Sequence, residues 1–484
     1  MVIPKEVKSV LKKLAEKGYE AYIVGGCVRD LLRGIEPKDW DVTTSAKPEE
    51  IEKLFKKSFY ENKFLTVTVQ TDSKIPSLKE IEVTTYRSEA KYSDKRHPDE
   101  VRFAKTLKED LSRRDFTVNA MAVSANGEII DPFSGQKDLG NKIIKTVGDP
   151  EKRFGEDALR MMRAVRFAAT LGKDWQIEPE TARAVEKNAP WLQAISKERI
   201  RDELLKIIMS QRATEGIEIL RRLGLLEYVM PELLAGYGVG QNKHHIYDCY
   251  EHSLKSLDYA AKQGFNMHVR MAALLHDIAK PIVKQGEGED STFYNHEIVG
   301  AKTTVRILSR LKFPKKDIEK IAKLVRYHLF YYNVDEVTES SVRRLVRQVG
   351  PENMEELLQV RMADRIGSGV PKAEPYKLRH LKYIIDKVSQ DPISVKKLKL
   401  SGNEVMKVLD ISPGPRIGQV LDVLLGIVLN DPDRNKKDIL KKEVERLGKM
   451  SEKEIKELAE KAREEREKLE MKRDEMTKKK YWVS

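Results

Sequence analysis

Residues 25–41 read GGCVRDLLRGIEPKDWD, a glycine pair followed by two aspartates. The apolar run at 21–24 predicts a strand, and the residues after the glycines predict a helix. Backbone amides at such a turn approach a phosphate closely, and the helix dipole favours its negative charge. Gly25 and Gly26 are therefore predicted to form a phosphate-binding turn, although a glycine pair alone would also suit an ordinary turn.

Asp39 and Asp41 stand two positions apart, so on a strand both carboxylates leave the same face. Neighbouring anions repel each other unless a cation lies between them, and oxygen ligands suit Mg²⁺. Glu82 alternates with the apolar Ile81 and Val83 on another predicted strand and is a candidate third catalytic acid. Each acid alone would also suit a solvated position, but the glycine turn upstream favours a catalytic magnesium site.

Residues 156–166, EDALRMMRAVR, predict a helix. Asp157, Arg160 and Arg163 then follow one side at three-residue steps, with Arg166 at the margin. One explanation is a salt-bridged surface, and the other is a set of groups that contact a nucleotide.

Base selection gives Asp157 and Arg160 a chemical role. Cytosine and adenine each present an amino donor beside a ring-nitrogen acceptor, whereas uracil and guanine present a carbonyl beside a ring N–H. Asp157 can accept from the amino group while Arg160 donates to the ring nitrogen. A mismatch sets acceptor against acceptor and donor against donor, at a cost of about 1–3 kcal/mol per wrong base. The pair is therefore predicted to select C and A.

Residues 25–30 with 39–41 resemble the signature of class II tRNA nucleotidyltransferases and bacterial poly(A) polymerases, members of the polymerase-β nucleotidyltransferase superfamily. The resemblance implies that Gly26 and Arg29 contact the nucleotide and that the two aspartates bind Mg²⁺. Residues 113–120, RRDFTVNA, resemble the family's ribose- and triphosphate-contacting motif. The other nucleotide contacts that the family implies are Arg114 on the phosphates, Asp115 and Asn119 on the ribose, and Glu156, Asp157, Arg160, Arg163 and Arg166 in the base-reading motif.

Residues 86–103 help to predict whether the product is CCA or poly(A). They resemble the undeleted flexible loop of enzymes that add all of CCA, although an ordinary exposed loop has the same composition. A mobile charged segment there would reshape the site when the incoming base changes from C to A. We therefore expect addition of CCA to tRNA 3′ ends from CTP and ATP, with poly(A) synthesis as an alternative.

Histidines are concentrated in the middle of the chain, where seven of the nine lie between His244 and His328. Imidazoles and carboxylates from several helices suit Mn²⁺, Ni²⁺ or Fe²⁺. Their order resembles the HD phosphohydrolase superfamily, which implies phosphatase and 2′,3′-cyclic phosphodiesterase activity in RNA end repair. A site kept only for RNA docking, and a metallophosphohydrolase as the whole function, are alternatives. The ligands implied are His252, His276, Asp277 and Asp364, with His296 and His328 matching the additional histidines of dinuclear members.

Composition and charge agree with an RNA-processing enzyme. Lys and Arg number 90 against 77 Asp and Glu, and the net charge of +13 suits a polyanionic partner such as tRNA, although by itself it would equally suit a basic surface kept for solubility. Two cysteines cannot form a disulfide framework, and the sequence shows neither a signal peptide nor a membrane-spanning apolar run. We expect a cytoplasmic protein without membrane contact, while the sequence leaves its oligomeric state open.

The expected fold class is α+β: a small polymerase-β-like nucleotidyltransferase head with a mixed sheet, then an all-helical neck, HD-containing body and tail. Period-two strand patterns and an Asn126-Gly127 hairpin turn between strands at 116–125 and 128–131 characterise the head. Residues 131–135, DPFSG, match a further family motif near the neck. The expected parts are 1–146 for the head, 147–226 for the neck with the base-reading motif, 227–375 for the body with the HD domain, 376–450 for the RNA-binding tail and 451–484 for a charged C-terminal helix.

Overall fold

The computed structural model describes residues 2–61, 66–90, 100–242, 246–389, 395 and 398–483. The predicted loop at 86–103 is described only at its two ends, because residues 91–99 lie outside the described part, as do His244 and His245. The chain divides into two units, Met1–Leu329 with Glu355–Pro371, and Phe330–Met354 with Lys372–Ser484.

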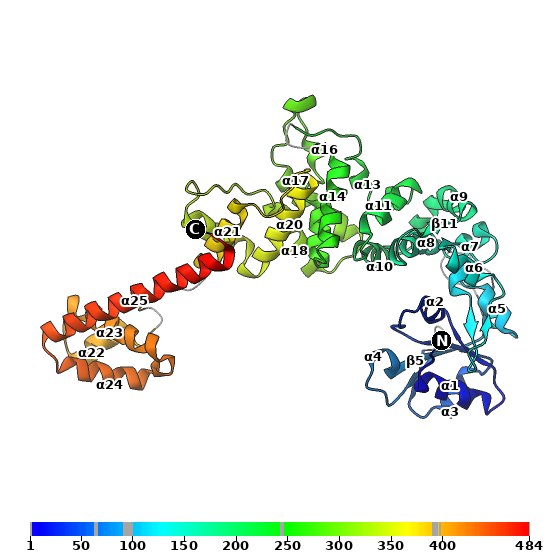
Figure 1. The fold of residues 1–484 in the computed structure, drawn as a ribbon, viewed down its shortest axis with the longest axis horizontal. Coiled ribbons are helices and arrows are strands. Elements are labelled where there is room, and N and C mark those ends of the chain that lie inside the picture. Colours follow the sequence, from blue (N-terminus) through cyan, green and yellow to red (C-terminus); the bar gives the residue numbers. More distant parts are fainter. Residues whose placement is uncertain are drawn as a thin grey trace. The chain divides into compact units, whose positions relative to one another are not determined.

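A seven-stranded mixed sheet forms the head, as expected (Figure 1). Its order is β3-β4-β5-β2-β1-β8-β9, in which β2 and β5 are parallel and the other neighbours antiparallel. The parallel pair matters because it sets two predicted acidic residues side by side. The strands are β1 Ala21–Val24, β2 Asp41–Thr44, β3 Ser58–Glu61, β4 Thr66–Gln70, β5 Glu80–Thr85, β8 Ala122–Val123 and β9 Ile129–Ile130.

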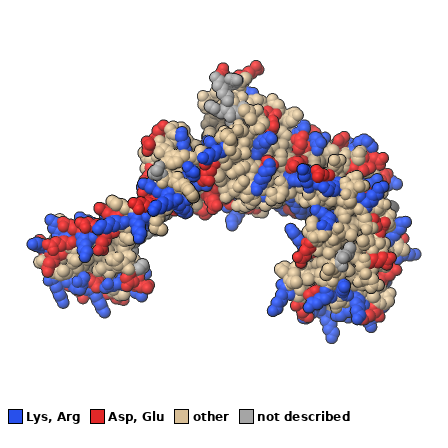
Figure 2. All heavy atoms as spheres, in the orientation of Figure 1, with Lys and Arg blue, Asp and Glu red and all other residues tan. Residues whose placement is uncertain are grey.

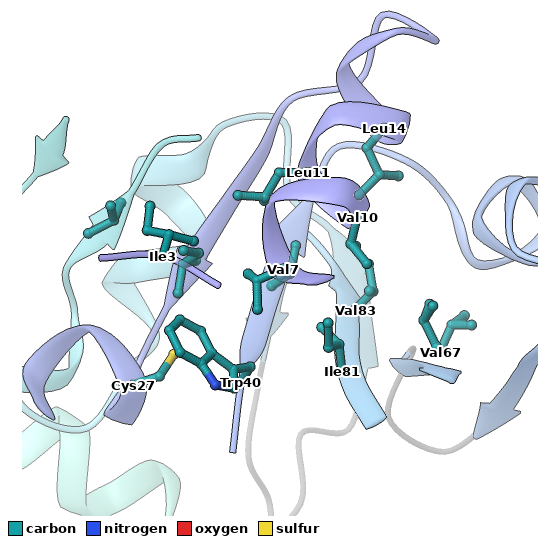
Figure 3. Packing of buried hydrophobic residues seen from close by; sticks show 14 of the residues in the cluster. Ile3, Val7, Val10, Leu11, Leu14, Cys27, Trp40, Val67, Ile81 and Val83 are labelled. Carbon is teal, nitrogen blue, oxygen red and sulfur yellow. The ribbon is translucent and has the colours of Figure 1, made fainter. Parts of the chain in front are cut away.

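Helix α1 (Lys5–Ala15) packs on the sheet through apolar residues three and four positions apart. Val7, Val10, Leu11 and Leu14 are buried and share one cluster with side chains of β2, β4 and β5 (Figure 3). Each such side chain contributes on the order of 1.5–3 kcal/mol on burial. The core therefore fixes the strands that carry the acidic residues.

The other head elements are α2 Gly26–Leu32, α3 Pro48–Leu54, α4 Pro76–Lys79, β6 Arg87–Ala90, β7 Glu100–Phe103, α5 Leu107–Ser112, η1 Thr117–Asn119, α6 Gly135–Gly140 and β10 Ile143–Ile144. Strands β6 and β7 pair antiparallel across the undescribed residues 91–99.

The predicted hairpin after residue 116 is present but much shorter than expected. Strand β8 covers only Ala122–Val123, while Thr117–Asn119 form a 3₁₀ turn. The carboxylate of Asp115 accepts hydrogen bonds from the Phe116 N–H and the Asn119 amide, and such local bonds compete with a strand ladder. The turn itself agrees with the prediction, because β8 and β9 pair antiparallel.

The predicted continuous helix over 156–166 is wrong. Helix α7 (Pro150–Glu156) ends one residue before Asp157, which is extended at φ −143° and ψ 104°, and α8 (Leu159–Thr170) begins after it. The Asp157 carboxylate accepts the Leu159 N–H at 3.0 Å and thereby satisfies a donor at the start of α8. Asp157 therefore binds the first residue of α8 from the break before the helix and does not lie on the helix face.

The neck also contains a short strand, which corrects the prediction that it is entirely helical. Strand β11 (Gln176–Ile177) pairs in parallel with β10 of the head. A shared apolar cluster that includes Phe116, Phe167 and Trp175 joins head and neck. The further neck elements are α9 Pro179–Asn188, η2 Ala189–Ala194, α10 Lys197–Ile208 and α11 Ala213–Arg222.

The remaining elements are helical. In the first unit they are α12 Leu226–Val229, α13 Pro231–Leu234, α14 Cys249–Lys262, α15 Met267–Leu275, α16 Lys280–Val283, η3 Gly288–Asp290, α17 His296–Arg310, α18 Lys315–Tyr327 and most of α20 Met354–Gly367. In the second unit they are α19 Glu339–Val349, η4 Pro351–Asn353, α21 Tyr376–Ser389, α22 Gly402–Leu409, α23 Pro415–Asn430, η6 Pro432–Arg434, α24 Lys437–Gly448 and α25 Glu452–Tyr481.

Charged side chains of both signs are interspersed over the face seen in Figure 2. Within the described ranges, every helix is too short or too polar to cross a membrane.

We predict that Gly135→Ala destabilises the head. A Cβ at this position would lie 2.3 Å from the Thr117 carbonyl oxygen and 2.8 Å from Met121 Cγ, so the backbone must shift. Overpacking of this kind costs about 1–3 kcal/mol. Urea unfolding should show the loss, whereas Gly140→Ala in the same helix, where a Cβ meets nothing within 4 Å, should be neutral. Equal stability of the two variants would contradict the packing at Gly135.

Candidate active site and metal centre

The acidic site of the head lies where β2 and β5 run parallel. Asp41 begins β2 and is in register with Glu82 of β5. Asp39 is exposed and precedes the strand, so the prediction that both aspartates lie on a strand is wrong for Asp39. Between them Trp40 is 3% exposed, and its burial in the core turns the flanking residues away from the core.

The carboxylates are crowded in a way that a cation would relieve. Burial, with the nearby Glu82 and Asp39, raises the pKa of Asp41 to about 6, although Arg114 opposes the shift. Oxygen donors grouped in this way suit Mg²⁺. The acids open on a cavity of about 300 Å³ whose lining also contains cationic residues. The lining residues are Val24, Asp41, Val42, Thr66, Glu82, Thr84, Arg87, Arg113 and Arg114.

Gly25 is required at this site by both conformation and space. Its φ of +82° lies where residues with a side chain are strained. A Cβ would stand 2.8 Å from Arg114 Nη1 and 3.3 Å from Asp41 Oδ2. Gly26 follows as the first residue of α2. The two glycines thus place backbone without side chains next to the acidic cavity. This is the position at which the sequence predicts a phosphate-binding turn.

A hydrogen-bonded chain joins three of the predicted motifs. Arg29 Nη1 donates to Asn119 Oδ1 at 2.7 Å, and Asn119 Nδ2 donates to Asp115 Oδ1 at 3.1 Å. Arg163 Nε donates to Asp115 Oδ2 at 2.8 Å. Burial would raise the pKa of Asp115, but Arg163 and the Asn119 amide hold it well below its ordinary value. Asp115 is therefore an anion bound between head and α8.

Phe167 is a residue of this site that the sequence reasoning missed. Its ring lies 5.3 Å from the guanidinium carbon of Arg29, 5.4 Å from that of Arg163 and 4.0 Å from that of Arg166. Cation–π contacts of this kind orient guanidinium groups. Its position four residues after Arg163 on α8 is the sequence signal that could have found it.

Arg160 places the start of α8 beside the acidic cavity. Its Nη2 donates to the carbonyl of Arg113, a cavity-lining residue, at 3.0 Å. Its Nη1 donates to Glu156 Oε2 at 2.5 Å and to the Arg153 carbonyl at 3.1 Å. The head thus contacts the predicted base-reading motif directly.

Helix α10 supports two of the predicted residues, and the sequence reasoning missed both supports. Arg199 binds the Asp157 carboxylate with its Nη2 at 2.7 Å. Glu203, one helical turn later and 4% exposed, pairs with Arg166 Nε at 2.7 Å. Their spacing of four residues puts both on one face of α10.

In the body, four imidazoles surround the Asp277 carboxylate from two sides. Oδ2 lies 3.1 Å from His252 Nε2 and 3.3 Å from His276 Nε2. Oδ1 lies 3.4 Å from His296 Nε2 and 3.7 Å from His328 Nε2. The two ligand groups that these atoms form share Asp277.

Asp364 completes the predicted set from α20. Its Oδ1 lies 3.5 Å from His252 Nε2 and 3.6 Å from His276 Nε2. Burial alone would lower the pKa of His276, but Asp277 and Asp364 raise it to about 10. A divalent metal would fit this group, because imidazole nitrogens and carboxylate oxygens are the donors that such metals take in proteins.

Backbone carbonyls fix which imidazole nitrogen faces this centre. Nδ1 of His276 lies 2.8 Å from the Ala273 oxygen, and Nδ1 of His328 lies 2.7 Å from the Val325 oxygen. A carbonyl can only accept, so each Nδ1 carries a proton, and Nε2 is the nitrogen that faces the candidate metal centre. His296 makes the same kind of bond to the Phe293 oxygen at 2.8 Å.

The metal centre opens on a cavity of about 830 Å³. Lys280, which the sequence reasoning missed, lines it, and its Nζ lies 2.7 Å from Asp277 Oδ2. Lys280 follows Asp277 by three residues, a short spacing that could have identified it. Arg361 and Arg365 also line this cavity, so three cations stand beside the ligand set.

Three family models match the chain: the poly(A) polymerase head domain at residues 21–145, a probable RNA- and SrmB-binding site of polymerase A at 174–236, and the HD domain at 249–368.

CCA-adding enzymes are among the relatives. The enzyme of Limosilactobacillus reuteri is 45% identical over 227 residues, which are 46% of this chain and 53%, or about half, of that protein. The enzyme of Pediococcus pentosaceus is 33% identical over 445 residues, which are 92% of this chain and 98% of that protein. A solved structure of the Bacillus stearothermophilus CCA-adding enzyme in complex with CTP is 29% identical, with a TM-score of 0.60 over 92% of this chain and 98% of that one.

We predict that Asp277→Asn weakens divalent-metal binding in the body at least roughly tenfold, because this carboxylate faces both histidine pairs. Calorimetric titration with Mn²⁺ on the variant and the parent protein measures the change. Glu287→Gln, which changes an exposed acid at the N-cap of η3, is the control and should bind as the parent does. Unchanged Mn²⁺ affinity in Asp277→Asn would remove the metal centre from this position.

Proposed function

The chain belongs to the family of CCA-adding enzymes, and on that premise we propose that it adds C, C and A to tRNA 3′ ends from CTP and ATP. The alignment with the Pediococcus pentosaceus enzyme, at 33% identity over 98% of that protein, supports the activity. The observation that carries the proposal is the bond from Arg160 to the Arg113 carbonyl, because it joins a base-reading motif to an acidic cavity.

Asp41 and Asp39, with Glu82 beside Asp41, would hold Mg²⁺ in the head. Their crowding and the raised pKa of Asp41 fit a divalent ion. When bound, the metal would lower the pKa of the RNA 3′-hydroxyl and neutralise charge on the transferred nucleotidyl group.

The protein's own cations would hold the nucleotide. Arg114 reaches the acidic cavity, and Arg29, Arg163 and Arg166 form an array on the Phe167 ring. Guanidinium groups held in a fixed geometry bind phosphate oxygens without reorganising during the reaction. Asp115 would act mainly by orienting Arg163, and its reach to a ribose hydroxyl, like that of Asn119, stays a prediction.

Base choice would belong to Asp157 and Arg160. The carboxylate accepts from the amino group of C or A, and the guanidinium donates to the ring nitrogen. Glu156 would keep Arg160 in place through their 2.5 Å contact. Uracil and guanine present the reverse pattern, so they meet like groups and are rejected.

We predict that Asp41→Ala lowers extension of tRNA lacking CCA by at least roughly 10³-fold, because the metal-holding carboxylate is lost. Incubation with Mg²⁺ and CTP and ATP, singly and mixed, followed by sequencing, reads the product. CCA followed by a stop supports the proposal, and an A-tract indicates poly(A) synthesis instead. Asp277→Asn should extend as the parent does. Loss of extension in both variants would contradict two separate sites.

A second activity in the body is favoured by its donor set. Four imidazoles with Nε2 turned inward, Asp277 and Asp364 meet a cavity lined by Lys280, Arg361 and Arg365. The cations suit the phosphate of an RNA 3′ end, and a bound Mn²⁺, Ni²⁺ or Fe²⁺ would supply hydroxide for phosphoester hydrolysis. We propose that this site trims phosphorylated RNA ends before extension.

We predict that RNA with a 3′-phosphate or 2′,3′-cyclic phosphate is hydrolysed with Mn²⁺ or Ni²⁺ and that Asp277→Asn abolishes this. Release of labelled phosphate measures the first substrate, and chromatography of the ring-opened product measures the second. Asp41→Ala should retain the activity, because Asp41 lies in the head. If the protein binds metal but hydrolyses neither substrate, the hydrolase proposal is wrong and the alternative of a site kept only for RNA docking is favoured.

A further inference from the structure

The carboxylate that the proposed function assigns to base reading is fixed from both sides. Asp157 Oδ1 accepts the Leu159 N–H at 3.0 Å and Arg199 Nη1 at 3.3 Å. Asp157 Oδ2 accepts Arg199 Nη2 at 2.7 Å. The guanidinium therefore grips the carboxylate with two nitrogens, a geometry that fixes its plane as well as its position.

Arg199 comes from outside the motif that it supports. It lies on α10 (Lys197–Ile208), whereas Asp157 lies in the extended break between α7 and α8. Because no helix sets the direction of the Asp157 side chain in this break, its position depends on contacts with other residues. The side chains of Arg199 and Asp157 are 32% and 18% exposed, so the pair borders solvent and a ligand can approach it.

The hydrogen bonds from Arg199 and Leu159 leave the Asp157 carboxylate one lone-pair direction in which to accept a further hydrogen bond. Each carboxylate oxygen has two lone-pair directions. On Oδ1 the Leu159 N–H and Arg199 occupy both, and on Oδ2 Arg199 occupies one, as far as the described residues go. The single acceptor that remains matches the single amino donor that cytosine or adenine presents beside its ring nitrogen.

Without Arg199, the carboxylate could turn about its side-chain torsions. It could then move an oxygen away from the O4 carbonyl of uracil and so reduce the repulsion that rejects this base. Discrimination by a polar pair depends on both partners being held where the mismatch cannot relax. A fixed Asp157 is thus needed for selectivity more than for binding of the correct base.

We propose that Arg199 is a specificity-determining positioning residue, which holds Asp157 so that one oxygen faces the incoming base. The inference rests on the proposed function, because it assumes that Asp157 reads that base. The same face of α10 carries Glu203, which pairs with Arg166 at 2.7 Å. Helix α10 therefore supports a base-reading group and a phosphate-binding group together.

A simple structural ion pair is the competing explanation. Partly exposed salt bridges contribute little to stability, and loss of one changes all substrates alike. A positioning residue, in contrast, changes the ratio between correct and incorrect bases. The ratio of kcat/KM for CTP to that for UTP separates the two explanations.

The test uses Arg199→Met in the full chain with tRNA lacking CCA. We expect the CTP-over-UTP ratio to fall by roughly tenfold or more, mainly through faster use of UTP, since a carboxylate that can turn no longer repels the O4 carbonyl of uracil. Arg199→Lys keeps the charge without the two-nitrogen grip and should restore only part of the ratio. Arg201→Met, on the same helix but paired with Asp202, is the control and should keep the parent ratio.

Asp157→Ala, assayed in parallel, distinguishes a failure of the role proposed for Arg199 from a failure of the proposed function. If the CTP-over-UTP ratio falls in Asp157→Ala but stays at the parent value in Arg199→Met and Arg199→Lys, the role of Arg199 is overturned and the proposed function is left intact. An unchanged ratio in Asp157→Ala overturns the base-reading proposal itself. The double variant should match Asp157→Ala, because Arg199 acts through that carboxylate. Should Arg199→Met fail to fold by thermal unfolding, the ratio in Arg199→Lys decides.

Discussion

An ion pair between the buried Asp115 of the head and the partly exposed Arg163 of α8 links the two halves of the candidate active site. Asp115 is 7% exposed, and a charge removed from water needs a partner in good geometry. The head supplies two hydrogen bonds to Asp115, from the Phe116 N–H and the Asn119 amide, and only α8 adds a positive charge. This ion pair, the bond from Arg160 to the Arg113 carbonyl and the apolar contact of Phe116 with Phe167 together hold the acidic cavity beside the predicted base-reading motif.

The sequence predicted the groups that carry chemistry better than the backbone that presents them. Gly25, Asp41 and Glu82 lie together as expected, whereas their binding of a phosphate or a metal stays a prediction. The helix expected through Asp157 is interrupted, since this carboxylate binds the Leu159 N–H instead. Helix periodicity cannot anticipate such a break, because the same aspartate suits either a helix face or a cap.

The supporting residues were the hardest to predict. Arg199 and Glu203 contact the site from a helix more than thirty residues further along the chain than the residues they hold. A chain in which 35% of residues are charged offers many candidate partners for every acid, and only tertiary packing selects among them. Phe167 and Lys280 differ, because each lies three or four residues from a residue that the sequence did identify.

The two candidate sites share one physical feature, in which bonds to the protein fix the orientation of a side chain that the proposed function turns towards a ligand. In the body, backbone carbonyls accept hydrogen bonds from Nδ1 of His276 and His328, so that Nε2 of each ring faces the candidate metal centre. In the neck, the Leu159 N–H and Arg199 occupy Asp157 Oδ1 and leave Oδ2 an acceptor direction. Fixing a group in advance removes the entropy cost of ordering it on binding, and it also prevents a mismatched ligand from finding a relaxed geometry. Under the proposed function, selectivity at each site would therefore depend as much on the bonds that face the protein as on those that face the ligand.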